Sequence, residues 1–112
     1  MGEVFNIIGA VGTAEVELAP YPGGSAKTPT GRVRKIYVMV FTNTTATAIT
    51  LTLKIYLDNS LEASFNIVVS ASSSVSLIGD VDSPILLIPS DRTLKAVASA
   101  GSVDVLMAGF DE

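Results

Sequence analysis

Apolar and polar residues alternate with a period of two through the middle of the chain. In residues 49–57 every second side chain is apolar, and the alternation returns over residues 61–69 after Asp58, Asn59 and Ser60. Because successive side chains of a strand point to opposite faces, this pattern predicts two half-buried strands joined as a β-hairpin. The residues predicted to share the apolar faces are Ile49, Leu51, Leu53, Ile55, Leu57, Leu61, Ala63, Phe65, Ile67 and Val69.

In the run of residues 33–41, which precedes this hairpin, apolar side chains occupy both the odd and the even positions. A strand with two apolar faces is typical of the middle of a sheet, with one face in the core and the other covered by a neighbour. We predict a central strand here. One face is expected to carry Ile36, Val38 and Val40, and the other Tyr37, Met39 and Phe41.

Four shorter apolar runs follow, over residues 74–78, 84–88, 93–99 and 102–109, and Gly, Pro, Ser and Asp separate them. These separators are turn-forming residues, and no segment has a helical period. The predicted fold is therefore all-β, an antiparallel β-sandwich of about eight strands, with a jelly roll as one arrangement that fits.

Three segments organise the rest of the chain. Residues 13–18 alternate and carry Glu15 and Glu17, which predicts an edge strand blunted by charge. A Pro- and Gly-rich stretch at residues 19–31 predicts an irregular surface loop. Residues 1–10 fit either an N-terminal arm or a first strand, and residues 11–112 are predicted to form a single sandwich domain.

Composition argues against catalysis and metal binding. Among its 112 residues the chain has no cysteine and no histidine. It therefore has no thiol nucleophile, no thiolate ligand and no imidazole base. No serine lies in a nucleophile-elbow sequence. We predict a protein that is not an enzyme, with no catalytic residues, no bound metal and no cofactor.

The net charge and the first residues of the chain limit the kinds of partner that we expect. A net charge of −4 argues against a nucleic acid as partner, because binding the phosphate backbone requires a basic protein surface. The cluster Arg32, Arg34 and Lys35 is split between two faces of a strand, so we interpret it as a solvated strand start. The first residues have neither a basic region nor a long apolar run, which predicts a soluble protein synthesised in a cytoplasm without membrane contact.

Two polar segments are interpreted as turns. Asp80 and Asp82 lack the further oxygen ligands of a calcium loop, so an Asx turn is the better interpretation. The serine-rich residues 70–74 lie between two alternating runs and predict a hairpin turn.

Tyr56 and Tyr21 are the tyrosines whose predicted positions would let a sugar ring stack on them.

Charged residues make up 16% of the chain, against roughly 25% in typical globular domains. A small domain with so little charge is expected to leave part of its apolar surface for a partner. We place that surface in the first ten residues and in the Pro-rich loop. The candidate partner-binding residues are Val4, Phe5, Ile7, Ile8, Tyr21 and Pro22.

The downstream half has an order of motifs that carries a resemblance. A Pro-Ile-x-Leu strand at 84–87 leads to an alanine-rich strand at 94–100, then to Gly101, a Val-Asp-Val strand at 103–105 and Gly109. From about residue 49 onward the chain resembles the small β-sandwich accessory virion proteins of tailed bacteriophages. The turn before the alanine-rich strand often reads Gly-Asp in that family, and this chain has Ser-Asp there.

The resemblance implies a structural virion protein with no catalytic residues. Its expected role is that of a capsid decoration or cement protein on the virion surface, made in the host cytoplasm. Its expected partners are the major capsid protein and copies of itself as a homo-oligomer. The alternative is a receptor- or glycan-binding module of a tail fibre, or another tail accessory protein.

Overall fold

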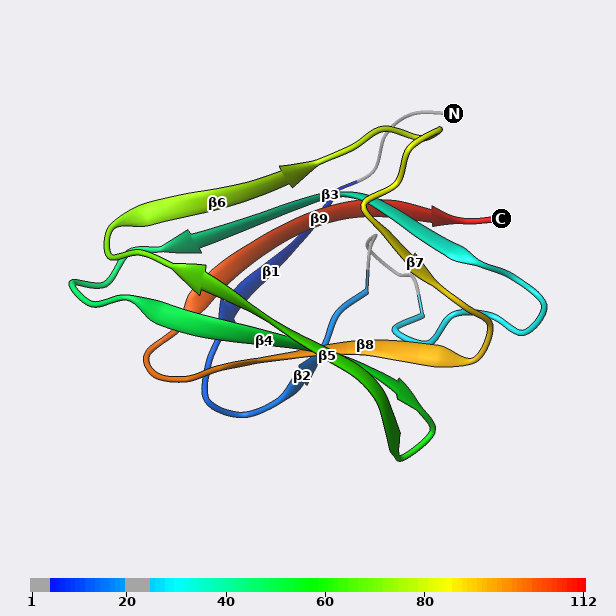
Figure 1. Cartoon of the computed structure of the whole chain (residues 1–112), viewed down its shortest axis with the longest axis horizontal. Coiled ribbons are helices and arrows are strands. Elements are labelled where there is room, and N and C mark those ends of the chain that lie inside the picture. The colour runs from blue at the N-terminus through cyan, green and yellow to red at the C-terminus, as the bar shows by residue number, and fades with distance from the viewer. Residues whose placement is uncertain (1–4, 20–24) are drawn as a thin grey trace.

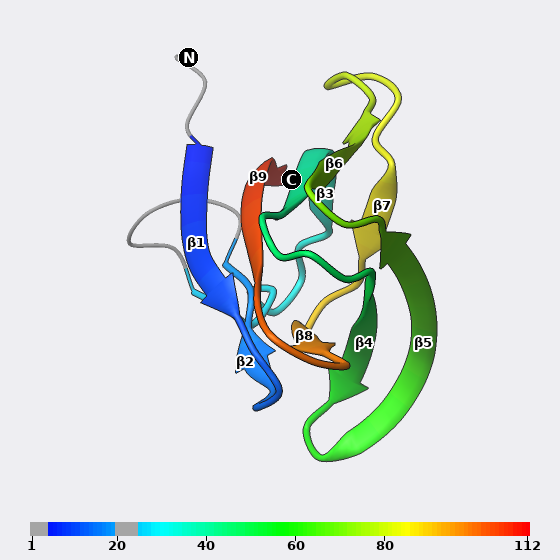
Figure 2. The same cartoon turned by 90° about the vertical axis from the view of Figure 1, so that its left-hand side faces the viewer.

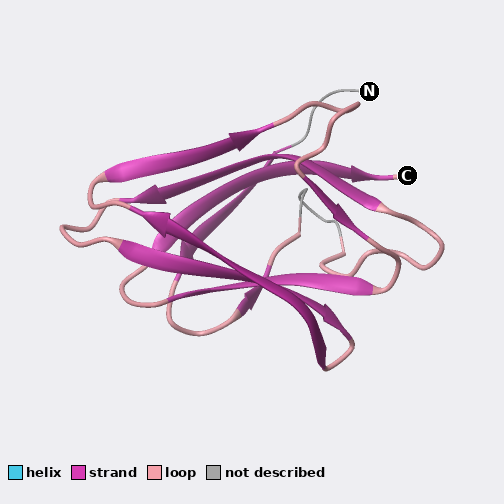
Figure 3. Cartoon of the chain, in the orientation of Figure 1, coloured by secondary structure: helices cyan, strands magenta, loops and turns pink. Residues whose placement is uncertain are grey.

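A computed structural model of the chain describes residues 5–19 and 25–112. The described residues contain strands, turns and loops but no helix (Figures 1 and 3). The nine strands are β1 (Phe5–Val11), β2 (Val16–Glu17), β3 (Arg34–Asn43), β4 (Ile49–Leu57), β5 (Ser60–Val69), β6 (Ser73–Ile78), β7 (Leu86–Ile88), β8 (Arg92–Ala98) and β9 (Val103–Asp111).

The strands form two antiparallel sheets that pack face to face. One sheet has the order β1-β9-β3-β6, with β7 also paired to β3, and the other has the order β2-β8-β4-β5. The pairs β1–β9, β2–β8, β3–β6 and β4–β5 are nested in the sequence, as in one long hairpin that has been rolled up. The predicted antiparallel β-sandwich is confirmed, and its strand order is that of a jelly roll.

The β4–β5 hairpin turns at Asp58 and Asn59, as the alternation predicts. Asp58 has a φ of 54°, a left-handed conformation that aspartate tolerates in tight turns. One expectation is wrong, because β5 has an extra residue at Glu62, where the pairing changes from Ile55–Ala63 to Tyr56–Leu61. This bulge moves Leu61 to the outer face of the sheet, away from the core.

A second bulge corrects the predicted faces of the central strand. β3 does lie inside its sheet, between β9 and the pair β6 and β7. However, its pairing with β9 is interrupted at Tyr37, so that Ile36 and Met39 both face the core although they are three residues apart. Ile36 therefore shares a face with Met39 and Phe41, while Val38 and Val40 are only half-buried on the outer side.

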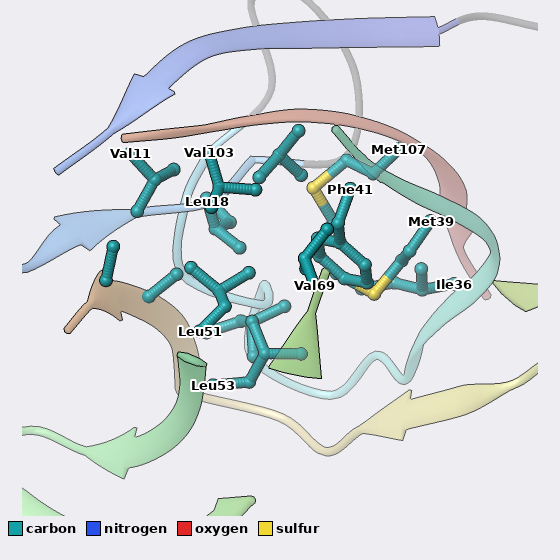
Figure 4. Packing of buried hydrophobic residues seen from close by; sticks show 14 of the residues in the cluster. Val11, Leu18, Ile36, Met39, Phe41, Leu51, Leu53, Val69, Val103 and Met107 are labelled. Carbon is teal, nitrogen blue, oxygen red and sulfur yellow. The ribbon is translucent and has the colours of Figure 1, made fainter. Parts of the chain in front are cut away.

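The core is one apolar layer between the sheets (Figure 4). β3 and β9 supply the sulfur-containing and aromatic side chains Met39, Phe41 and Met107, and β4 supplies Leu51 and Leu53. All five are nearly or fully buried. The other members of this cluster are Val11, Leu18, Ile36, Ile49, Ile55, Val69, Ile88, Leu94, Ala96, Ala98, Val103 and Val105.

Arg34 contradicts the expectation of a solvated basic cluster. Its side chain is 1% exposed, and Nε and Nη2 donate to the two carboxylate oxygens of Asp111 at 2.8 and 3.1 Å. Nη1 also donates to the carbonyl oxygen of Ala26 at 3.1 Å. A guanidinium is buried in this way only where a carboxylate and carbonyls meet its donors. The neighbouring Lys35 pairs with the exposed Glu112.

The connections between sheets include one further correction. The serine-rich segment after β5 does not close a hairpin, because β5 and β6 belong to different sheets, and the chain crosses between them with Ser72 at a φ of 50°. The Asx turn is confirmed: Oδ1 of Asp80 accepts bonds from the backbone N–H groups of Asp82 and Ser83. The segment predicted as an edge strand, residues 13–18, does lie at a sheet edge, but only Val16 and Glu17 form the strand β2.

Residues 5–11 form strand β1, which pairs along β9. Val11 at its end is fully buried in the core. The second half of the predicted loop, residues 25–31, lies against the start of β8, where Thr28 is buried and its N–H donates to the carbonyl oxygen of Arg92 at 2.9 Å.

We predict that Leu53→Asp unfolds the domain. Leu53 is fully buried in the middle of β4, and a buried carboxylate without a partner costs several kcal/mol. Thr52→Asp, on the opposite face of the same strand, is the control and should remain folded. Thermal unfolding followed by circular dichroism distinguishes the two, and a native transition in Leu53→Asp contradicts the core assignment.

Asp111→Asn should destabilise the domain by about 3 kcal/mol, because it removes the carboxylate charge that pairs with the buried Arg34 guanidinium. The matched control is Glu112→Gln, which breaks the Lys35 pair at a side chain that is 67% exposed and should cost less than about 1 kcal/mol. Urea unfolding measures both variants. Equal losses of stability would show that the buried Arg34–Asp111 pair stabilises the fold no more than the exposed Lys35–Glu112 pair.

Deleting residues 1–10 should leave β9 with an unpaired edge. Five residue pairs join β1 to β9, of which Val11–Val103 alone would remain, so we expect a loss on the order of 3 kcal/mol in the free energy of unfolding. Urea unfolding of the truncated chain tests this. Unchanged stability would contradict a contribution of residues 5–10 to folding.

Candidate partner-binding surface

Large apolar side chains are exposed mainly on one side of the sandwich. Among the side chains that the structure describes, eight large hydrophobic residues are exposed, and seven of them lie on β5, β6, β7 or the loop between β6 and β7. These strands occupy the side opposite β1 and β2 (Figure 2). We call the seven residues the apolar side: Leu61, Phe65, Val68, Leu77, Ile78, Val81 and Leu87.

The sheets diverge along β5, and this exposes its inner face. Val69 is fully buried and Ile67 half-buried, whereas Phe65 is 36% exposed and Ala63 is exposed as well. The exposure thus rises from the end of β5 toward the β4–β5 turn. Both views show this turn far from β6 and β7 (Figures 1 and 2). The opposite sheet therefore covers only one end of the inner face of β5.

The β6 and β7 strands add apolar groups on both faces of their sheet. Leu77 pairs with the core residue Met39 but is 37% exposed, because β6 forms the edge. Ile78 is 71% exposed on the outer face, and Val81 is 51% exposed in the Asx-turn loop that follows. Leu87 lies on the outer face beside Lys35. Exposed apolar side chains gathered along one edge of the sandwich favour a contact surface there.

Charge is nearly absent from this part of the chain. Residues 60–88 contain three carboxylates and no lysine or arginine. One carboxylate, Glu62, accepts a bond from Nε of Arg92 at 2.8 Å, and the other two belong to Asp80 and Asp82 in the Asx-turn loop. The low overall charge of the sequence therefore has a location. It favours a partner surface that is apolar and not strongly acidic.

Away from β5, the outer face of the β2-β8-β4-β5 sheet is polar, and its side chains pair with one another. Glu15 accepts hydrogen bonds from Nζ of Lys54 at 3.1 Å and from the Tyr56 hydroxyl at 3.3 Å. The bond to Glu15 raises the pKa of Lys54 above its usual value. Nζ of Lys95 lies 4.7 Å from the centre of the Tyr56 ring. A lysine thus occupies the tyrosine face that a stacked sugar would need.

The other two side chains with shifted pKa values, Asp91 and Arg92, lie at the turn before β8 and at its first residue. Asp91 has a φ of 67°, and bonds from the hydroxyls of Thr30 and Ser90 lower the pKa of its carboxyl group. The bond to Glu62 raises the pKa of Arg92. These bonds tie the Pro-rich loop and β5 to the start of β8. The carboxylates of Asp91 and Glu62 therefore have hydrogen-bond partners within the fold.

The remaining polar features lack reactive geometry. A shallow pocket of about 330 Å³ lies between the ends of β3 and β6, but the amide nitrogen of Asn43 there already donates to three backbone carbonyls. No group of three or more acidic, cysteine or histidine side chains that could hold a metal occurs in the described residues. Every buried side-chain polar atom described has a partner.

The partner-binding residues predicted from the sequence fall largely outside this description. Val4, Tyr21 and Pro22 lie outside the described residues. Phe5, Ile7 and Ile8 belong to β1, where their backbones pair with β9, and their side chains lie outside the described part. The apolar side was missed. Its signals were two consecutive apolar residues ending a short strand and the absence of basic residues over 60–88.

The chain matches no protein-family model and no curated protein sequence. Over residues 5–19 and 25–112, no helix has the length and apolar character needed to cross a membrane.

Proposed function

We propose that this protein is a structural protein that acts by adhesion, with its apolar side as the contact surface. One observation carries the proposal: seven of the eight large hydrophobic side chains exposed in the described residues lie on that side. Because residues 60–88 have no basic residue and few acids, burying this surface against a protein leaves few charges to desolvate.

The specific role that we propose is that of a decoration or cement protein on a phage capsid. The motifs between residues 84 and 109 support it through their resemblance to tailed-phage accessory virion proteins. The jelly-roll strand order supports it by analogy, since jelly rolls are frequent in viral capsid domains. In this role the partners are the major capsid protein and copies of this chain, and the location is the virion surface.

Adhesion of this kind needs many modest contacts and no strong single one. A capsid presents the same binding site repeatedly, so a copy held at one contact meets the next at a high effective concentration. The side chains that would contact the shell are Ile78, the most exposed of the seven, and Val81 in the loop that follows it. They lie beyond the core, so they are available for contact without unfolding.

Ile78→Lys tests this proposal. The side chain is 71% exposed, so the variant should fold normally, and it should bind at least ten times more weakly to virus particles purified from the same source as the chain. Val33→Lys is the matched control, because Val33 is 38% exposed and lies outside the apolar side. Co-sedimentation with the particles measures binding.

The outcomes separate the alternatives. Stoichiometric binding to heads that is lost in Ile78→Lys and kept in Val33→Lys supports the cement role. Binding confined to tails, located by electron microscopy of labelled protein, would favour a tail accessory role instead. Absence of binding by the unmodified protein, or equal binding by Ile78→Lys, contradicts the proposed contact surface.

A further inference from the structure

β5 is a long strand with one unpaired edge. It has ten residues and pairs with β4 alone in the described part of the chain. Its residues 60–66 are all exposed. An edge of this kind presents a row of backbone N–H and C=O groups that can pair with another strand.

The usual protections of an edge strand are weak here. Lysine, proline and inward charges normally block edge pairing, and β5 has none of these. Its single charge, Glu62, lies in the bulge next to the turn and is paired with Arg92. By contrast, β2 at the opposite edge of the same sheet is only two residues long and is flanked by Glu15.

We propose that β5 pairs antiparallel with β5 of a second copy, so that two four-stranded sheets join into one of eight strands. Antiparallel pairing of identical strands is related by a two-fold axis, so length and exposure match automatically. With the axis near Phe65, the inner faces of both strands lie on the same side. The uncovered side chains of Ala63 and Phe65 then form one apolar strip across the junction.

The size of this contact fits a weak dimer. Ten residues make β5 about 33 Å long, and the edge of one sheet, roughly 10 Å thick with its side chains, presents on the order of 330 Å². This area is below the about 800 Å² that a standard interface buries on each partner, so the contact belongs with weak interfaces. Pairing along the strand makes about ten hydrogen bonds, a usual number for an interface.

Charge does not oppose a second copy at this edge. The chain carries a net charge of −4, so two copies repel each other over most of their surfaces. Along β5 the only carboxylate is already paired with a guanidinium, which makes this edge one of the least repulsive places for two copies to meet. The inference rests on the proposed function, in which the apolar side contacts copies of the protein as well as the shell.

Sedimentation equilibrium of the free protein tests the dimer. We expect a dissociation constant on the order of 10 µM for the unmodified chain and a value at least ten times higher for Phe65→Lys, which places two lysines near the axis. Ser64→Lys changes an exposed polar residue and serves if Phe65→Lys fails to fold. Val33→Lys is the control and should dimerise normally.

The absence of cysteine allows a direct test of the pairing. Ser64→Cys, Phe65→Cys and Asn66→Cys place a single thiol at successive positions near the axis. Only a position at the axis brings two Cβ atoms within the roughly 4 Å that a disulfide needs, so one of the three should cross-link far more than Val33→Cys.

Several results would overturn the inference. The free protein could remain a monomer at about 500 µM, the dimer could be unaffected by both lysine variants on β5, or none of the three thiols could cross-link. These failures are distinct from failure of the proposed function. Ile78→Lys tests attachment to particles, whereas the β5 variants test association in their absence.

Discussion

Burial of a single apolar layer between two sheets is the constraint on which the rest of this structure depends. Met39, Phe41, Leu51 and Leu53 need cover from both sides, and each sheet supplies one face. The bulge at Tyr37 serves this layer, because it restores Ile36 to the core side where strict alternation would turn it outward. The Arg34–Asp111 pair closes the layer at one end with polar groups that satisfy each other.

Where this layer ends, the contact surface begins. The sheets can stay together only as far as side chains fill the space between them, and on β5 that distance ends near Ile67. Beyond this point the strand continues with β4 as its only neighbour in the described residues. The same sequence pattern, alternating apolar residues, thus builds core at one end of β5 and exposed surface at the other.

Alternation and turn residues were sufficient to predict the fold class, the β4–β5 hairpin, the central place of β3 and the Asx turn at Asp80. They were insufficient wherever a bulge shifted the alternation, as at Tyr37 and Glu62. The burial of Arg34 could not be predicted, because its partner is 77 residues away in the chain. The apolar side was missed because period two shows which face a residue occupies, and only tertiary packing decides whether that face is covered.

The position of β9 has a consequence for how the chain acquires its structure during synthesis. It is the last strand in sequence, yet it lies between β1 and β3, and its ladder with β1 spans most of the chain. The ribosome therefore synthesises residues 103–111 after both neighbours of that strand, β1 and β3. Until β9 is made, the edges of β1 and β3 that it pairs with stay open. We expect such a chain to fold slowly and in one concerted event, because its ladders join residues far apart in the sequence.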